Sequence, residues 1–194
     1  MDLGYPEGAT PIDPDEAVGL RLTHITTREQ LNIFEQENIR AGMAWAWRAR
    51  PKELVSVDFM RRLHQQMFGH VWRWAGEFRR SNKNIGVPRE EIGVELHKLC
   101  RDAAHWIGHG TYAPDEIAAR FHHRLVSIHA FANGNGRHAR LITDLLLEKR
   151  LDRPRFTWGR ADLERTGEAR QRYIAALQAA DKGDYAPLLA FVRS

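Results

Sequence analysis

The sequence predicts an all-α chain, a bundle of helices that carries one short β-hairpin. Apolar residues recur at spacings of three and four along most of the chain, as at Ile117, Phe121 and Leu125, and this period places them on one face of a helix. Capping residues such as Ser56 stand directly before several of these stretches, at the position where helices begin. Residues 78–87 instead have the composition of a short hairpin, with a turn at Asn82-Lys83-Asn84. A plain connector is the alternative for this segment.

The composition narrows the class of protein. The 194 residues are enough for one domain with a substantial core and too few for two large ones. Cys100 is the only cysteine, which excludes a disulfide framework and fits a reducing compartment. No apolar run approaches the roughly twenty residues that a membrane span needs, and the acidic start is unlike a signal peptide. We therefore expect a cytoplasmic protein without a membrane partner.

The charge of the chain is mildly basic, with a net charge of +4 and a pI near 9.5. The arginines are spread along the chain and often alternate with acids, as in residues 48–53 and 160–168. Blocks of like charge, which are typical of nucleic-acid-binding tails, are missing. A nucleic-acid partner is therefore not expected.

The order of the elements follows from caps and helix breakers. Residues 1–27 are rich in proline and predict an extended arm that lies on the domain. Thr26 or Thr27 caps a helix that begins near Arg28 and ends before Pro51, with a buried face made of Leu31, Phe34, Ile39, Met43 and Trp47. The other predicted helices span residues 57–67, 90–106, 115–128, 134–150, 163–180 and 185–192. The predicted organisation is an arm at 1–27, an N-terminal helix at 28–53 and a main domain at 54–194.

Residues 129–140 concentrate the reactive groups of the chain in a loop between two helices. Gly134-Asn135-Gly136 falls where the second helix begins, and the first backbone N–H groups of a helix have no intrahelical partner. These groups attract an anion, and Arg137 and Arg140, one turn apart, can clamp a polyphosphate. His129, at the other end, can accept a proton from an attacking hydroxyl. Together these parts predict phosphoryl or nucleotidyl transfer, although a lone Gly-Asn-Gly is usually only a turn.

The same segment resembles the signature of the Fic family, H-x-F-x-(D/E)-G-N-G-R-x-x-R, at every fixed position except one. Asn133 stands where the family has an acidic residue. Trp74-Ala75-Gly76 also resembles an upstream segment of Fic domains. The resemblance covers about residues 54–192 and is strongest at 129–140. It implies a helical Fic-type bundle, with residues 54–194 as the Fic domain.

The resemblance implies a protein adenylyltransferase that uses ATP as its substrate. His129 would be the general base on a Tyr, Ser or Thr hydroxyl of a target protein, and the nucleotide would be bound by Gly134, Asn135, Gly136, Arg137 and Arg140. Removal of AMP, transfer of UMP or phosphocholine, and a catalytically weak nucleotide-binding interaction module stay open as alternatives. An antitoxin or other regulatory partner, as in a toxin–antitoxin pair, is a further expectation.

Asn133 bears on the expected Mg²⁺. An amide oxygen brings only a dipole to the ion where the family's carboxylate brings a full charge, and Mg²⁺ usually relies on one or two carboxylates together with substrate phosphates. We therefore expect weakened protein ligation of Mg²⁺ at Asn133 and weak magnesium-dependent transfer.

Glu37-Asn38 resembles the end of an inhibitory pattern of some Fic proteins, (S/T)-x-x-x-E-(G/N), with Ile33 where Ser or Thr is expected. The resemblance implies that Glu37 pairs with Arg140 and obstructs the site of the γ-phosphate, so that the protein inhibits itself. A carboxylate would compete with phosphate oxygens for the same guanidinium. The alternative is that Glu37 is an exposed helix charge.

The hairpin region resembles the Fic flap that binds the target as an added strand. Its residues here are Asn82, Lys83, Asn84, Ile85 and Gly86. Strand addition supplies main-chain hydrogen bonds without demanding one sequence. The identity of the target therefore cannot be predicted from this segment.

Overall fold

The computed structural model describes residues 13–194 apart from 23, 26, 51–53, 161–162 and 164–166. The described residues are mostly helical and contain almost no β-structure, which confirms the predicted all-α class. The α-helices are α1 (Pro14–Ala17), α2 (Arg28–Arg48), α3 (Val57–Phe68), α4 (Ile92–His109), α5 (Pro114–Ile128), α6 (Asn135–Arg150), α7 (Glu168–Asp181) and α8 (Ala186–Arg193). Short 3₁₀ turns lie at η1 (Arg89–Glu91) and η2 (Trp158–Arg160).

The helix starts follow the capping residues of the sequence. The Thr27 hydroxyl accepts from the backbone N–H of Gln30 at 3.3 Å, so α2 begins at Arg28 as predicted. The Ser56 hydroxyl accepts from the N–H of Phe59 at 3.2 Å and starts α3 in the same way. Helix α7 begins at Glu168, later than the predicted residue 163, and residues 164–166 of that prediction lie outside the described part.

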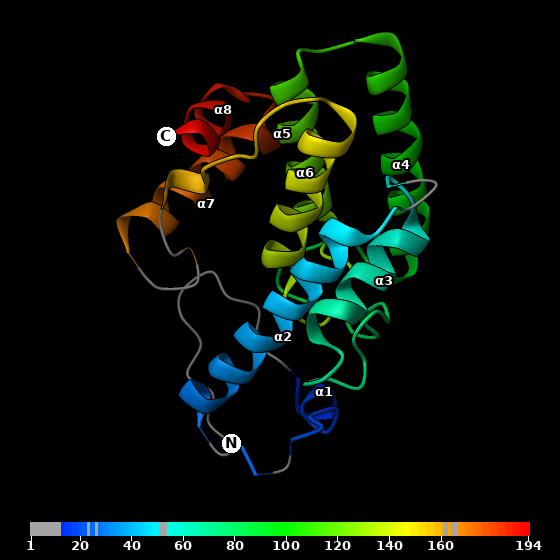
Figure 1. Ribbon diagram of the computed structural model, residues 1–194, viewed down its shortest axis with the longest axis vertical. Coiled ribbons are helices and arrows are strands. Elements are labelled where there is room, and N and C mark those ends of the chain that lie inside the picture. The colour runs from blue at the N-terminus through cyan, green and yellow to red at the C-terminus, as the bar shows by residue number, and fades with distance from the viewer. Residues whose placement is uncertain (1–12, 23, 26, 51–53, 161–162, 164–166) are drawn as a thin grey trace.

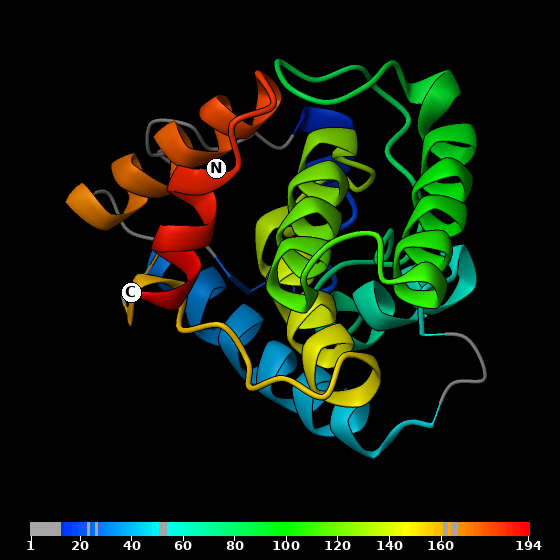
Figure 2. The same ribbon diagram turned by 90° about the horizontal axis from the view of Figure 1, so that it is seen from above.

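Helices α5 and α6 form an antiparallel pair in the middle of the bundle (Figures 1 and 2). Helix α4 lies on one side of this pair, and α7 and α8 lie on the other. Helices α2 and α3 pack together against α6, and α2 reaches from the start of α6 at Arg137 to its last turn at Lys149. The larger hydrophobic core contains residues of α2, α3, α4, α5 and α6. A second, smaller cluster contains residues of α5 and α6 that pack against α7, α8 and η2. The loop between α5 and α6 is therefore held in place by two helices that are themselves packed against neighbouring helices on several sides.

The buried face of α2 differs from the predicted one. It consists of Leu31, Glu35, Asn38, Gly42 and Ala46. A Cβ atom at Gly42 would lie 2.8 Å from the Cα of Met67 in α3, so the two helices approach too closely for large side chains between them. The large apolar residues of the prediction, apart from Leu31, flank this contact and are only half-buried. The close approach, which no local pattern reveals, selected small and polar residues for the interface.

Residues 78–87 form an irregular loop, whereas a hairpin was predicted. The N–H of Arg79 donates to the carbonyl of Ala130 at 2.9 Å and that of Val87 to Ile128 at 3.3 Å, so both ends of the segment pair with the α5–α6 region. The Arg79 guanidinium enters the loop and donates to the carbonyls of Ser81 and Val87. These side-chain bonds occupy acceptors that a hairpin would use in a cross-strand ladder, and this explains the missing strands.

The described part of the N-terminal segment lies on the domain, and it is helical at Pro14–Ala17 where an extended arm was expected. It contains α1 and an isolated antiparallel β-bridge between Leu20 and Trp72. Residues 1–12 of the predicted arm are outside the described range. None of the described helices combines the length and the apolar character needed to cross a membrane.

Candidate active site

His129 closes α5 and opens the loop that leads to α6. It adopts a left-handed backbone conformation, with φ of 54° and ψ of 57°, which is uncommon for a residue with a side chain. Its carbonyl accepts from Nε of Arg79 at 2.7 Å, and its side chain is largely buried. Conformations of this kind persist only where the surroundings enforce them, and they are frequent at active sites.

The His129 imidazole is neutral at physiological pH. Burial lowers its pKa to about 4, and the positive charges of Arg79 and Lys83 act in the same direction, against a backbone contact with Val126 that raises it. A neutral imidazole can accept a proton. A polyphosphate bound nearby would favour the charged form and would raise this pKa toward the operating range of a general base.

Two buried side chains fix the loop after His129. Asn135 accepts from the N–H of Phe131 at 2.9 Å and donates to its carbonyl at 2.8 Å, which joins the two ends of the loop. The Phe131 ring is buried and stacks on His64, with ring centroids 3.8 Å apart. Phe131 therefore anchors the loop in the core, and the Asn135 side chain acts inside the loop. Only the backbone of Asn135 is placed to meet an anion.

His64 supports the loop from α3. The N–H of Gly76 donates to its Nδ1 at 3.0 Å, so the neutral ring carries its proton on Nε2 and donates it to the carbonyl of Asn133 at 3.0 Å. Complete burial holds the pKa of His64 well below its usual value, so the ring stays in this neutral form. The Trp-Ala-Gly segment is in this way connected to the catalytic loop.

The two glycines of the loop have different constraints. Gly134 has a φ of 79°, and a Cβ there would lie 2.4 Å from the Phe68 ring. At Gly136 a Cβ would lie 3.4 Å from Nη1 of Arg140, which is a tolerable contact. The first helical hydrogen bond of α6 runs from the N–H of His138 to the carbonyl of Gly134 at 2.9 Å. The amides of residues 135–137 precede it and form the predicted anion-binding helix start.

Arg137 points toward α2. Its Nη1 lies 2.7 Å from a carboxylate oxygen of Glu35, and its Nη2 donates to Oδ1 of Asn133 at 3.0 Å. The other carboxylate oxygen of Glu35 accepts from Nε1 of Trp72 at 2.7 Å. Glu35 is only 2% exposed, so this ion pair is buried.

The predicted partners in this region were Glu37 and Arg140, whereas the structure brings together Glu35 and Arg137. Side chains two residues apart on a helix point about 200° apart, so Glu35 and Glu37 cannot face the same neighbour. Glu37 is exposed and lies beside His70 and Val71. The buried positions Leu31, Glu35 and Asn38 have spacings of four and three and so share one face of α2, but two of them are polar, and the sequence therefore gave no apolar period that identifies Glu35.

Arg140 faces a different group of neighbours on α6. Burial is the main reason that the pKa of His122 is lowered, and the positive charge of Arg140 lowers it further. At Asp144 the same charge opposes the rise in pKa that burial produces. Arg140 also lies close to Gly136 at the start of the helix. The two arginines of the loop therefore approach the helix start from different sides.

The oxygen atoms of this region do not form a Mg²⁺ site built by the protein. Asn133 contributes one neutral amide oxygen, and this oxygen accepts from Arg137. Within the part of the chain that the structure describes, no three histidine, cysteine or acidic side chains lie together in a way that could hold an ion. The ligand set does not fit the predicted ion beyond one weak oxygen, because Mg²⁺ prefers carboxylates.

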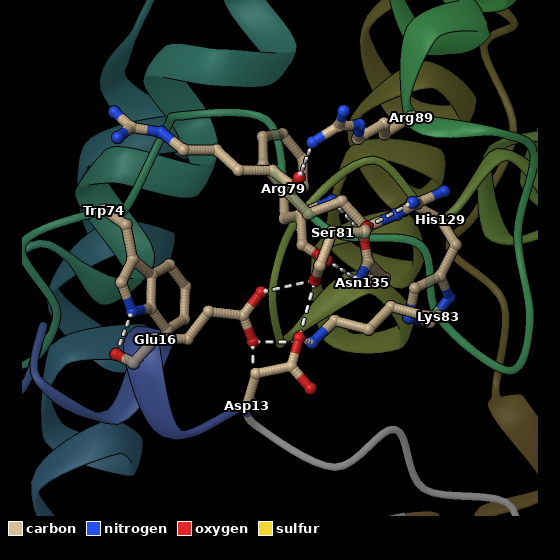
Figure 3. A network of polar contacts seen from close by, with 11 residues as sticks. Asp13, Glu16, Trp74, Arg79, Ser81, Lys83, Arg89, His129 and Asn135 are labelled. Carbon is tan, nitrogen blue, oxygen red and sulfur yellow. Dashed lines mark hydrogen bonds and ion pairs between the residues drawn. The ribbon is translucent and has the colours of Figure 1, made fainter.

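The flap, residues 82–86, brings Lys83 close to His129 (Figure 3). Arg79 anchors the base of the flap, because its side chain donates to His129, Ser81 and Val87. A Cβ at Gly86 would lie 2.8 Å from the Cβ of His129, so the flap touches the predicted base. The sequence did not single out Arg79, because an arginine followed by Arg80 next to a predicted turn gave no signal of a buried role.

Comparison with known proteins identifies relatives of this site. The model of the Fic/DOC family matches residues 54–147, which include the whole segment from His129 to Arg140. Protein adenylyltransferase Fic of Drosophila virilis is 31% identical over 144 residues, which are 72% of this chain and 28% of that protein. The Aedes aegypti protein of the same name is 28% identical over 144 residues. The chain spans about a quarter of the length of these curated relatives, 27–28%.

Solved structures share the fold. A fragment of Fic-1 from C. elegans is 27% identical with a TM-score of 0.60, over 82% of this chain and 47% of that one. The N-terminal FIC domain of Bep8 from Bartonella sp. 1-1C has a TM-score of 0.70 at 15% identity and covers 89% of each chain. BepC from Bartonella tribocorum, solved with bound AMPPNP, has a TM-score of 0.68 at 16% identity over 97% of this chain and 93% of that one.

Proposed function

We propose that this chain, which belongs to the Fic/DOC family, transfers AMP from ATP to a hydroxyl side chain of a target protein with His129 as the general base. The observation that carries the proposal is the neutral, buried imidazole of His129 at one end of a braced loop whose other end is the start of α6. The names of the relatives support AMP as the transferred group.

The reaction follows from the positions of these groups. The neutral imidazole accepts the proton of the target hydroxyl, whose oxygen forms a bond to the α-phosphorus of ATP. The bond from that phosphorus to the oxygen bridging to the β-phosphate breaks, and pyrophosphate leaves. Backbone N–H groups of residues 135–137 hold phosphate oxygens, while Arg140 offsets charge on the leaving group. Positioning and fixed charges supply most of the acceleration in a reaction of this kind.

We propose no protein-bound metal step. Asn133 gives a poor ligand set, so Mg²⁺ would reach the site with the phosphates of ATP and would supply further neutralisation of their charge. The chain's own contribution is the imidazole, the helix start and the two arginines.

Intact-mass measurement tests the proposed function. After incubation with ATP, Mg²⁺ and a target or the protein itself, the parent should gain the mass of AMP, and His129→Ala should lose about 10²- to 10⁴-fold in rate. His109→Ala, which changes an exposed histidine at the end of α4, is the matched control and should behave as the parent. Equal modification by His129→Ala and the parent would contradict the assignment of the base.

The ion pair between Glu35 and Arg137 supports a proposal about inhibition. A carboxylate on Arg137 competes with phosphate oxygens for the same guanidinium, so Glu35, instead of the predicted Glu37, would restrain nucleotide binding. Glu35→Gln removes the charge and keeps an acceptor for Trp72, and calorimetry should show tighter ATP binding. Glu37→Gln is the matched control. Tighter binding by Glu37→Gln alone would restore the inhibitory role predicted for Glu37.

A further inference from the structure

The described end of the N-terminal arm covers the flap next to His129 (Figure 3). Residues 13–17 of this segment form the arm tip, and residues 19–21 form the arm anchor. Nζ of Lys83 in the flap lies 2.7 Å from a carboxylate oxygen of Asp13 and 2.6 Å from one of Glu16. The Ser81 hydroxyl donates to Asp13 at 2.6 Å. Only 3% of the Lys83 side chain remains exposed under these contacts.

Several bonds that do not involve Lys83 hold the flap in shape. Arg79 holds the base of the flap through His129, Ser81 and Val87. The backbone of Val87 is bonded to Ile128, and Asn82 accepts from the N–H of Arg89 at 2.9 Å. The Lys83 ammonium donates to the carboxylates of Asp13 and Glu16 in the arm tip. Because the bonds of Arg79, Val87 and Asn82 do not involve Lys83, a target carboxylate can take the place of those of the arm tip without breaking them.

The arm tip is attached less firmly than the arm anchor. Backbone bonds hold the anchor, since the N–H of Arg21 donates to Val71 and that of Arg73 donates to Gly19, both at 2.8 Å. The tip forms α1, a helix of 4 residues in which no residue is buried. Within the described residues, apart from the bond of Trp74 Nε1 to the Glu16 carbonyl at 3.0 Å, the hydrogen bonds and ion pairs of the tip with the domain are those of its carboxylates with the flap. The tip can therefore leave while the anchor stays.

We infer that Lys83 recognises a carboxylate on the target segment, and that Asp13 and Glu16 occupy this position until an acidic target segment displaces the arm tip. This inference rests on the proposed function, because it names the chemistry of the target that the flap would take. The favoured target is a segment with Asp or Glu close to the modified hydroxyl.

The selection follows from the energetics of a desolvated cation. A segment that displaces the arm tip and covers Lys83 must supply a carboxylate, since an ammonium left buried and unpaired is strongly unfavourable. A neutral segment would lose the competition with the arm tip, and a basic one would add repulsion. Asp13 and Glu16 thus act as a filter as well as a cover.

Peptide binding without nucleotide tests the inference. The probes are a fluorescent peptide with one Ser, one Thr and one Tyr, each beside Glu, and a matched peptide with Gln at every Glu position. The double variant Asp13→Asn with Glu16→Gln should bind the acidic peptide about ten-fold more tightly than the parent at physiological salt. Adding Lys83→Met should abolish that gain. The Gln peptide should bind weakly to all of these proteins.

Matched variants exclude a general effect of charge. Asp15→Asn removes a carboxylate from the exposed side of α1, and Lys182→Met removes an exposed cation, so both should leave binding as in the parent. Equal binding of the two peptides by the double variant, or a gain that survives Lys83→Met, would overturn the inference. Absence of binding by every protein would overturn it as well.

Hydrogen exchange gives a second measurement that does not depend on a peptide. In the double variant, exchange should rise at the amides of Glu16 and Ala17 in the tip, while the amides of Arg21 and Arg73 stay protected. Unchanged protection of the tip would contradict a displaceable cover. Because neither experiment uses ATP, a failure of AMP transfer with normal peptide binding would reject the proposed function and leave the recognition by Lys83 standing.

Discussion

Two carboxylate contacts reach the site from the N-terminal part of the chain, and they are held in different ways. Glu35 belongs to α2, a helix of 21 residues, and is 2% exposed between Arg137 and Trp72. Asp13 and Glu16 belong to the short α1, and the Asp13 side chain is 41% exposed although it contacts the nearly buried Lys83. The contact of Glu35 is part of the core, and the contact of Asp13 and Glu16 with Lys83 lies on the outer side of the flap.

The difference shows that the same chemical pairing can have opposite roles on two sides of one site. A buried pair whose partners are fixed by packing cannot open without loss of stability. A pair carried by a short, unburied helix costs little to open, so it can respond to a competing ligand. The nucleotide side of the site is therefore expected to be stiff, and the target side to be exchangeable.

Lowering the pH should have the largest effect on stability, because it protonates buried histidines of the core and leaves the ion pairs of the arm tip in place. Burial lowers the pKa of His122 to about 3 and those of His129 and His138 to about 4, from 6.5. Below pH 6.5 the unfolded chain binds protons at these histidines that the folded chain does not, so their contribution to the free energy of unfolding is fully present above pH 6.5 and is lost as the pH drops toward 4. The pKa of Asp144, which burial raises to about 7, has the opposite effect and offsets part of this loss. Hydrogen bonds from Lys83 lower the pKa of Asp13, so the tip contact persists through this window.

Thermal unfolding followed from pH 7.5 to pH 4 checks this, with hydrogen exchange at the tip measured at the same values. We expect the midpoint to fall steadily below pH 6.5. A midpoint that stays constant down to pH 4 would show that these histidines are not neutral in the fold. If the tip amides lost their protection from exchange at a higher pH than the one at which the unfolding midpoint falls, the arm tip and not the core would be the acid-sensitive part.

Breaking the buried contact should have the next largest effect. Glu35→Ala leaves Arg137 and the Trp72 N–H without their shared acceptor, and removal of one partner of a buried pair costs about 3–5 kcal/mol in the free energy of unfolding. Urea denaturation measures this difference. Glu37→Ala, on the exposed side of the same helix, should change stability by less than about 0.5 kcal/mol. Similar losses in both variants would contradict the assignment of Glu35.

Filling the loop tests how closely the nucleotide side is packed. Gly134→Ala places a Cβ against Phe68 and forces a left-handed backbone on alanine, which together should cost about 2–4 kcal/mol in the free energy of unfolding and weaken ATP binding. Gly136→Ala meets only the end of Arg140 and is the control. Urea denaturation and calorimetry measure the two effects. A stable Gly134→Ala protein with parental ATP affinity would show that the loop is loose.

Opening the arm tip should have the smallest effect on stability. The double variant Asp13→Asn with Glu16→Gln should lower the free energy of unfolding by about 1 kcal/mol or less in urea denaturation, because the short tip opens and returns the Lys83 ammonium to water instead of leaving it buried and unpaired. Asp15→Asn is the control and should be neutral. A loss as large as that of Glu35→Ala would place the tip within the cooperative core.

The sequence by itself determined the helices, their capped starts and the segment that carries the chemistry. Thr27 and Ser56 cap helices with their own side chains, and the apolar spacing before His129 defines α5, because these interactions span only a few residues. The loop from His129 to Arg140 was recognisable for the same reason, since its base, glycines and arginines are neighbours in the chain.

Only the tertiary structure decided which distant residues meet that loop. Glu35 instead of Glu37 reaches an arginine because the close approach of α2 and α3 around Gly42 sets the rotation of α2. Arg79 replaces a hairpin with bonds to His129, and Asp13 and Glu16 find Lys83 across a separation of 67 to 70 residues. Contacts between distant segments depend on how whole helices pack, and no local pattern of residues contains that information.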